Sequence, residues 1–183
     1  MYIALGVVAV VLVLLVVAYN TLVRLRVLVD NAWADIDVQL KRRHDVIPNL
    51  VETVKGYAAH EKGTLSGVVE ARAKAMTAQG PEARGEAERG LAGALGKLFA
   101  LAEAYPQLRA AENFSQLQAS LMQIEEAVQS ARRYYNAVVR DNNTKVAQVP
   151  WNILAGLFGF GAREFFQITD ETERSVPSVS FTS

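Results

Sequence analysis

The chain has 183 residues, which is enough for one domain with a short appendage. Hydrophobic residues make up 51% of it, and this excludes a disordered polar chain or a Pro/Gly-rich linker protein. The 19 basic and 19 acidic residues cancel, so we expect no nucleic-acid partner. The absence of cysteine excludes disulfides, thiolate nucleophiles and zinc fingers.

An uninterrupted apolar segment opens the chain. Residues 3–18 carry no polar side chain, and no charged side chain precedes Arg24. About 20 helical residues cross a hydrocarbon layer about 30 Å thick, so we predict a transmembrane anchor over residues 1–23. Tyr2 and Tyr19 stand near its two ends, where amphipathic rings favour the membrane interface.

Two alternatives to an anchor remain for this segment. A cleaved signal peptide normally has a positively charged region before its apolar core, and no Lys or Arg stands there in this sequence. A buried helix of a soluble protein is the other alternative. Cations instead follow the segment, and the positive-inside rule then places the N-terminus outside and the C-terminal part in the cytoplasm. These cations are Arg24, Arg26, Lys41, Arg42 and Arg43.

Residues 24–148 are patterned for helices. Apolar side chains recur at spacings of three and four in residues 22–78, 82–104 and 110–146. Pro48 is expected either to kink the first stretch or to divide it, while Gly80-Pro81 and Tyr105-Pro106 separate the stretches. We therefore predict an all-α fold, with an N-terminal transmembrane helix followed by an antiparallel bundle of three to four long helices.

The third stretch has the clearest pattern in the chain. Its apolar residues form a seam of a and d positions that packs at about 20° against partner helices. The seam is longer than one short bundle needs, which favours self-association into a homo-oligomer. The seam residues are Phe114, Leu117, Leu121, Ile124, Val128, Ala131, Tyr135 and Val138.

The composition changes again in residues 149–168, which are rich in aromatic residues and glycine. This segment either caps the bundle or contacts the membrane surface or a partner protein. The tail, residues 169–183, is predicted to be flexible. The candidates for contact with the membrane interface are Tyr2, Tyr19, Arg24, Arg26, Trp151, Phe158 and Phe160.

Patterns that indicate catalysis are missing. A carboxylate metal site in a bundle needs Glu-x-x-His pairs, but Lys41 and Tyr57 stand three residues before the two histidines. His60-Glu61 has no second histidine at the spacing of a zinc protease. The sequence contains neither a G-x-S-x-G motif nor a phosphate-binding glycine loop. We expect no catalytic, metal or cofactor site, and hence no enzyme.

Two charged clusters, residues 41–45 and 132–136, have two interpretations. Residues 41–45 either form a solvated or bundle-paired charged turn or contact anionic lipid headgroups. Residues 132–136 either combine core tyrosine with paired arginines or form a partner-binding site. Polar side chains near the helix seams are expected to set register rather than to react. The interaction and register candidates are Trp33, Asp35, Arg42, Arg43, His44, Asn113, Arg132, Arg133, Tyr135 and Asn136.

Two blocks of sequence resemble a known family. Residues 31–61 read NAWADIDVQLKRRHDVIPNLVETVKGYAAHE, and the second block contains Tyr105-Pro106, residues 112–114 (ENF) and residues 131–136 (ARRYYN). Together with the apolar N-terminus and the aromatic C-terminal segment, these blocks resemble the LemA family of bacterial membrane proteins over nearly the whole chain. The chain departs from the family pattern at Asn142, where Tyr is usual, and at Val149, where Phe is frequent.

The resemblance implies one helix in the bacterial inner membrane and a cytoplasmic helical domain, and it brings no catalytic residues. Our leading hypothesis is a membrane-anchored, non-enzymatic helical scaffold that self-associates at the cytoplasmic face of the bilayer. One alternative is an adaptor or accessory subunit of a membrane protease, transporter or envelope-stress system, with another membrane protein as its partner. The other alternative is a membrane-remodelling protein that acts through residues 151–166.

Overall fold

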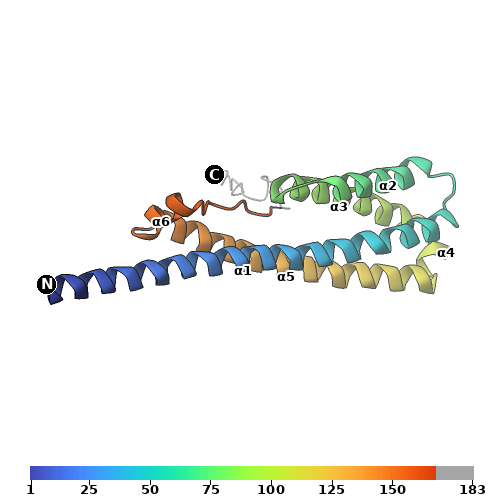
Figure 1. Cartoon of the computed structure of the whole chain (residues 1–183). Coiled ribbons are helices and arrows are strands. Elements are labelled where there is room, and N and C mark those ends of the chain that lie inside the picture. Colours follow the sequence, from blue (N-terminus) through green and yellow to red (C-terminus); the bar gives the residue numbers. More distant parts are fainter. Residues whose placement is uncertain (168–183) are drawn as a thin grey trace, which may run out of the picture. The chain divides into compact units, whose positions relative to one another are not determined.

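The computed structural model describes residues 1–167 of the chain. Over these residues the fold is all-α and has no strand, which confirms the predicted fold class (Figure 1). The predicted tail, residues 169–183, and residue 168 lie outside this part. The helices are α1 (Tyr2–Lys55), α2 (Lys62–Thr77), α3 (Pro81–Glu103), α4 (Pro106–Arg109), α5 (Glu112–Ala147) and α6 (Trp151–Phe158).

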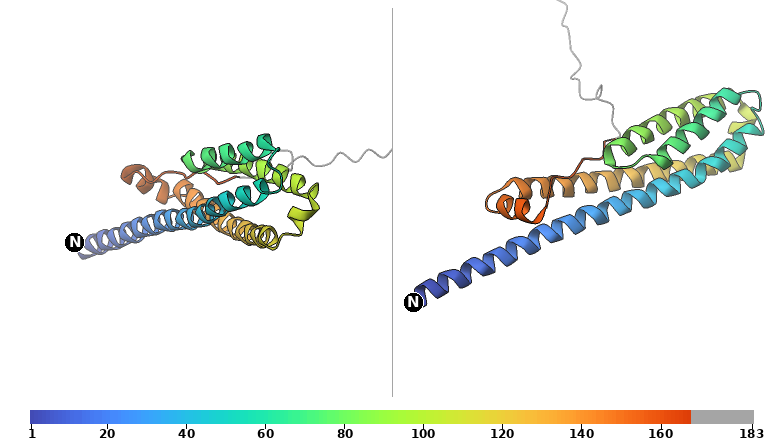
Figure 2. Two further views of the ribbon diagram at one scale, coloured as in Figure 1. Left: turned by 90° about the vertical axis from the view of Figure 1, so that its right-hand side faces the viewer. Right: turned by 45° about the horizontal axis from the view of Figure 1, so that its top comes forward.

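Helix α1 is continuous over 54 residues and includes Pro48 (Figure 2). Pro48 occupies an exposed position, where its ring displaces no core side chain, so the helix tolerates the loss of one hydrogen bond. The helix ends after Lys55 instead, where the N–H of Ala58 bonds to the carbonyl of Val54 at 2.9 Å. The predicted stretch 22–78 is therefore two helices, but the break comes at residues 56–61 and not at Pro48.

The side chains of α1 experience two environments. All residues before Ala18 are exposed, whereas one stripe of side chains is buried from Ala18 onward. A helix that is apolar on every side suits lipid, and a helix with one apolar stripe suits packing against other helices in water. In the described residues, α1 is the one helix long and apolar enough to span a membrane, which supports membrane anchoring. The buried stripe comprises Leu22, Val29, Ala32, Ile36 and Leu40.

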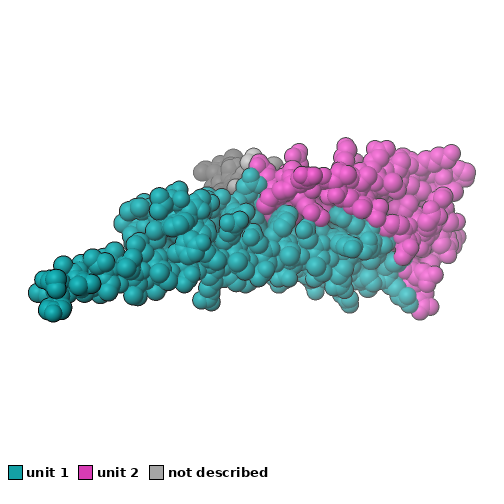
Figure 3. Space-filling view, viewed as in Figure 1, with its two compact units in different colours: residues 1–47, 115–165 teal, residues 48–114, 166–183 magenta. Residues whose placement is uncertain are grey.

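The chain divides into two compact units (Figure 3). Unit 1 contains residues 1–47 and 115–165, and unit 2 contains residues 48–114 and the chain from residue 166. Helix α1 contributes to both units, because the boundary falls at Pro48.

In unit 1, α1 and α5 run antiparallel. The rings of Trp33 and Tyr135 are 5.3 Å apart, and farther along α1 the Arg43 guanidinium lies 3.5 Å from the carboxylate of Glu125. Residues farther along α1 therefore contact residues earlier in α5, as expected of an antiparallel pair. The seam of α5 is buried, as its spacing of three and four predicts. Its buried members in this unit are Leu121, Ile124, Val128, Tyr135 and Val138.

In unit 2, α2 and α3 form a helical hairpin connected by residues 78–80. Gly80 has a φ of 81°, which favours glycine, and Pro81 begins α3, as the Gly-Pro pair predicts. Gly85 of α3 is buried where the backbone of Gln167 passes, and an added Cβ would collide with that backbone. The predicted stripe of the second stretch is buried at Leu91, Leu95, Leu98 and Ala102.

The fold predicts unequal costs for two substitutions on the same helix. Ile36 is fully buried, so Ile36→Ala is expected to lower the free energy of unfolding by about 2–5 kcal/mol through lost burial and a cavity. Val38 is 55% exposed, and Val38→Ala is expected to change it by less than about 0.5 kcal/mol. Circular dichroism melting of the full chain in mild detergent compares the variants, and equal melting points would contradict the placement of α1.

Candidate functional site

The aromatic residues predicted for the membrane interface meet at one place in unit 1. The ring of Tyr19 on α1 lies 5.0 Å from that of Phe158 and 5.8 Å from that of Phe160, edge to face in both pairs. Such geometry aligns ring edges with ring faces and adds to the packing energy. The N-terminal apolar segment and the C-terminal aromatic segment, which lie far apart in the sequence, are thus neighbours.

An aliphatic core lies beneath these rings. Leu154 and Ala155 of α6 are buried together with Ala18 and Leu22 of α1, and Trp151 packs against this cluster. Ala18 and Leu22 stand where the apolar segment of α1 ends. Helix α6 therefore closes over α1 at the end of the predicted membrane span.

The other interface candidates differ in their distance from these rings. Tyr2 begins α1 at its far end and Arg24 is exposed on α1, whereas Arg26 lines a pocket of about 270 Å³ together with Phe160 and Arg163. The ammonium of Lys145 lies 3.9 Å from the centre of the Trp151 ring, a cation–π contact that joins α5 to α6.

Residues 159–165, which we call the strap, follow α6 without helical structure and are held by polar side chains of α5. Asn143 donates to the carbonyl of Arg163 at 2.9 Å and accepts from the N–H of Arg163 at 2.7 Å. Asn142 donates to the carbonyl of Gly161 at 3.2 Å, and Tyr135 donates to the carbonyl of Glu164 at 2.8 Å. The strap's backbone thereby gains partners that it cannot find in a helix.

We did not predict Asn142 and Asn143 as site residues, although their position inside a predicted helix was a signal in the sequence. Adjacent asparagines inside a helix are unfavourable unless their side chains have partners elsewhere. Asn142 is also the position where the chain departs from the family pattern. The strap has an ion pair with α1 as well, because the Arg163 guanidinium lies 3.1 Å from the carboxylate of Asp30.

Burial raises the pKa of the Tyr135 hydroxyl above its usual value near 10. The positive charge of Arg163 opposes this shift in pKa, and the negative charges of Glu164 and Asp30 reinforce it. The hydroxyl consequently stays protonated at neutral pH and keeps the proton that it donates to Glu164.

The structure separates the ten interaction and register candidates. Trp33 and Tyr135 meet, as described, and Arg43 pairs with Glu125, so these three hold α1 to α5. His44 is buried, and Arg132 and Asn136 are half-buried. The candidates on the exposed surface are Asp35, Arg42, Asn113 and Arg133.

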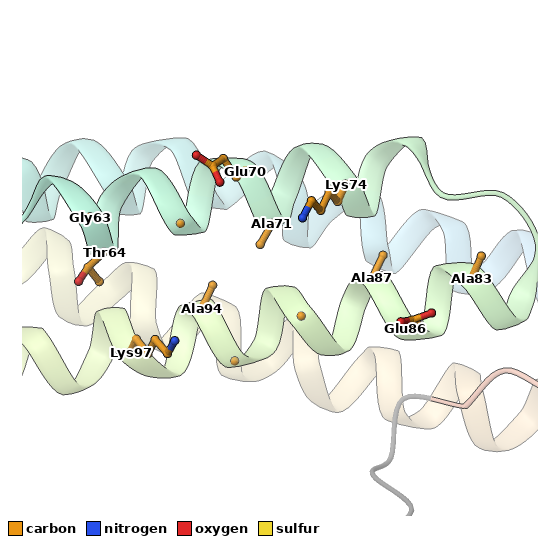
Figure 4. A pocket seen from close by; sticks show the side chains of 13 residues that line it. Gly63, Thr64, Glu70, Ala71, Lys74, Ala83, Glu86, Ala87, Ala94 and Lys97 are labelled. Atoms are coloured by element: carbon orange, nitrogen blue, oxygen red, sulfur yellow. The ribbon is translucent and has the colours of Figure 1, made fainter.

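Unit 2 carries an open groove between α2 and α3, with a volume of about 760 Å³ (Figure 4). Small residues recur on the side of each helix that faces the groove, at every fourth position on α2 (Gly63, Gly67 and Ala71) and at spacings of four and three on α3 (Ala83, Ala87, Gly90 and Ala94). This repeat is visible in the sequence, although we predicted no interaction residue in α2 or α3 from it. Small side chains leave both backbones accessible to a third helix.

Charged side chains of both signs also line the groove. Glu70 and Lys74 come from α2, and Glu86 and Lys97 come from α3 (Figure 4). Two acidic and two basic groups give this surface no net charge. In residues 1–167, no three His, Asp or Glu side chains are grouped so that they could hold a metal ion.

These features define a class of protein: an all-helical body continuous with an apolar N-terminal helix that supports membrane anchoring. The profile of the LemA family matches residues 32–181, and the chain belongs to the LemA family. It is a LemA family membrane protein with distant homology to the magnetosome protein MamQ.

Three relatives show this homology. Magnetosome proteins MamQ 1 and MamQ 2 of Paramagnetospirillum magneticum are each 28% identical to the chain in an alignment of 179 positions, and the alignment covers 84% of the chain. Magnetosome protein MamQ of Magnetospirillum gryphiswaldense is 26% identical in an alignment of 178 positions that covers 83% of the chain. The chain spans 66% of the length of the first two relatives and 65% of the third, slightly less than two thirds.

Because Tyr135 bonds to the strap, we expect phenylalanine substitutions at Tyr135 and at its neighbour Tyr134 to affect the free energy of unfolding differently as the pH changes. Tyr135→Phe removes the bond to Glu164 and is expected to lower the free energy of unfolding by about 1 kcal/mol at neutral pH. Because the pKa of Tyr135 is raised on folding, its contribution is complete below about pH 10 and disappears as the pH rises through the folded-state pKa. The loss caused by Tyr135→Phe should therefore shrink at alkaline pH.

Tyr134 is the matched control, since its ring is 51% exposed. At each pH in the range, Tyr134→Phe should have the same unfolding midpoint as the wild-type chain. Denaturant titrations of the full chain between pH 7 and pH 11 provide the comparison. A Tyr135→Phe effect that is absent at neutral pH, or that grows at alkaline pH, would refute the role of the hydroxyl.

Proposed function

We propose that this LemA family protein is a membrane-anchored, non-enzymatic scaffold that self-associates at the cytoplasmic face of the bacterial inner membrane. The groove between α2 and α3 carries this proposal. The seam of α5, which the sequence favours for self-association, is occupied within the chain by α1 in unit 1. Self-association therefore needs another surface, and the groove is open to a partner.

The lining of the groove suits a helix of a second copy. Gly67 and Gly90 present backbone without a side chain, so an incoming helix can approach closely. Contacts between two helix backbones require the helices to pack closely, and larger side chains at these positions would keep the helices apart. The groove is thus a place where helices of two copies pack closely.

The charges of the groove favour a symmetric pair of copies. In a two-fold interface the same surface of each copy meets that of the other. If one residue of the first copy contacts a second residue of the other copy, the equivalent contact also forms with the copies exchanged. A surface that carries Glu70, Glu86, Lys74 and Lys97 offers acidic and basic partners to its own copy. Complementary charges of this kind set register and specificity more than affinity.

The anchor places these surfaces in one plane. Arg24 and Arg26 follow the apolar segment of α1, and the positive-inside rule then assigns the helical body to the cytoplasm. Confinement to a membrane raises the effective concentration of the copies, so a modest interface suffices for assembly. The homology to proteins named for the magnetosome is compatible with a role in organising membranes.

A matched pair of glycine substitutions tests the groove. Gly90 lines it, while Gly96 lies on the same helix outside it, and both positions are exposed with no atom within 4 Å of an added Cβ. Leucine at either position raises helix propensity equally, by up to about 1 kcal/mol. Gly90→Leu fills the groove and should weaken self-association at least tenfold, whereas Gly96→Leu should not.

Sedimentation velocity of the full chain in mild detergent over micromolar concentrations measures the association. Equal association constants for Gly90→Leu and Gly96→Leu would exclude the groove as the interface. A wild-type chain that is monomeric at every concentration would overturn the scaffold. In that case crosslinking in membranes followed by pulldown, with one dominant heterologous partner, would favour the adaptor or accessory-subunit alternative.

A further inference from the structure

We propose that α6 is a second membrane contact, whose exposed apolar face lies in the interfacial region of the same bilayer that α1 spans. The face is defined by Ile153 and Leu157. This inference rests on membrane anchoring by α1 and is independent of self-association through the groove.

The face is apolar and open. Ile153 and Leu157 are 67% and 75% exposed and lie one turn apart on one side of α6, and Val149, which is 74% exposed, precedes the helix. Asn152 is the one polar side chain in the helix. A helix that buries one apolar side against its own chain and leaves a second apolar side uncovered needs another apolar environment.

The position of α6 along α1 identifies that environment. Measured from Tyr2 at roughly 1.5 Å per residue, a hydrocarbon layer about 30 Å thick ends close to Leu22. Helix α6 packs on Ala18 and Leu22, and its C-terminal aromatic ring contacts Tyr19. The open face of α6 is thereby held at the depth where the hydrocarbon gives way to the headgroups.

Lipid is the occupant that these surroundings favour. The exposed apolar side chains of α1 extend to Val17, the residue before Ala18, on which α6 packs. Exposed Arg24 and Arg26 follow on α1, where cations meet anionic headgroups. At eight residues, α6 is too short to span the bilayer and suits an interfacial position.

The cysteine-free chain permits single labels at chosen sites. Leu157→Cys carries a nitroxide on the proposed face, and Met122→Cys carries one on α5 at a position that is 63% exposed and equally apolar. The full chain is reconstituted into vesicles of phosphatidylethanolamine and phosphatidylglycerol at several thousand lipids per protein. Power saturation then compares collisions with oxygen, which concentrates in lipid, with collisions with a polar nickel chelate, which stays in water.

The proposal predicts that the Leu157 label collides with oxygen several times more often, relative to the nickel chelate, than the Met122 label does. Ile153→Cys should behave as Leu157→Cys does, which guards against a local effect of one label. Equal ratios for the Leu157 and Met122 labels would place α6 in water and overturn the proposal. Exclusion of both reagents from Leu157 would also overturn it, because a protein surface would then cover the face.

Discussion

One helix has to satisfy two solvents, and the rest of unit 1 follows from how α1 does so. The backbone hydrogen bonds of a helix are internal, so the backbone passes from lipid to water without change and only the side-chain pattern has to differ. In α1 the pattern changes at Ala18, from apolar on every side to a single buried stripe. That stripe defines the side of α1 on which α5 packs, and the point of change is where α6 returns to it.

The return of the chain to this point depends on polar side chains. A two-turn helix such as α6 has little stability of its own. It is held by burial of Leu154 and Ala155 on α1 and by the hydrogen bonds of Asn142 and Asn143 to the strap. Two asparagines that weaken α5 locally thus fix the C-terminal segment. Through that segment, they also fix the apolar face that we assign to the membrane.

Periodicity was enough to predict the long helical stretches and the seam of α5, and the uninterrupted apolar segment was enough to predict the anchor, because each depends on neighbours within a few turns. The break at residues 56–61 was missed, since Pro48 gives the stronger local signal and its exposed position became visible only in the fold. The contacts of Asn143 with Arg163 could not be predicted from periodicity, because the two residues are 20 positions apart and are brought together only by the fold. The groove was missed because glycine in a helix normally indicates weakness rather than a surface.

Continuity of α1 from the membrane into the helical body is the central claim, and one distance tests it most directly. Val16 and Val38 are exposed on α1, on either side of the point where its pattern changes. Nitroxide labels at these two positions, in the full chain in lipid nanodiscs, can be measured by double electron–electron resonance. An unbroken helix predicts one narrow distribution centred at roughly 33 Å, from a rise of 1.5 Å per residue. A broad distribution, or a clearly shorter mean distance, would show that the helix breaks at the membrane surface and would contradict the account.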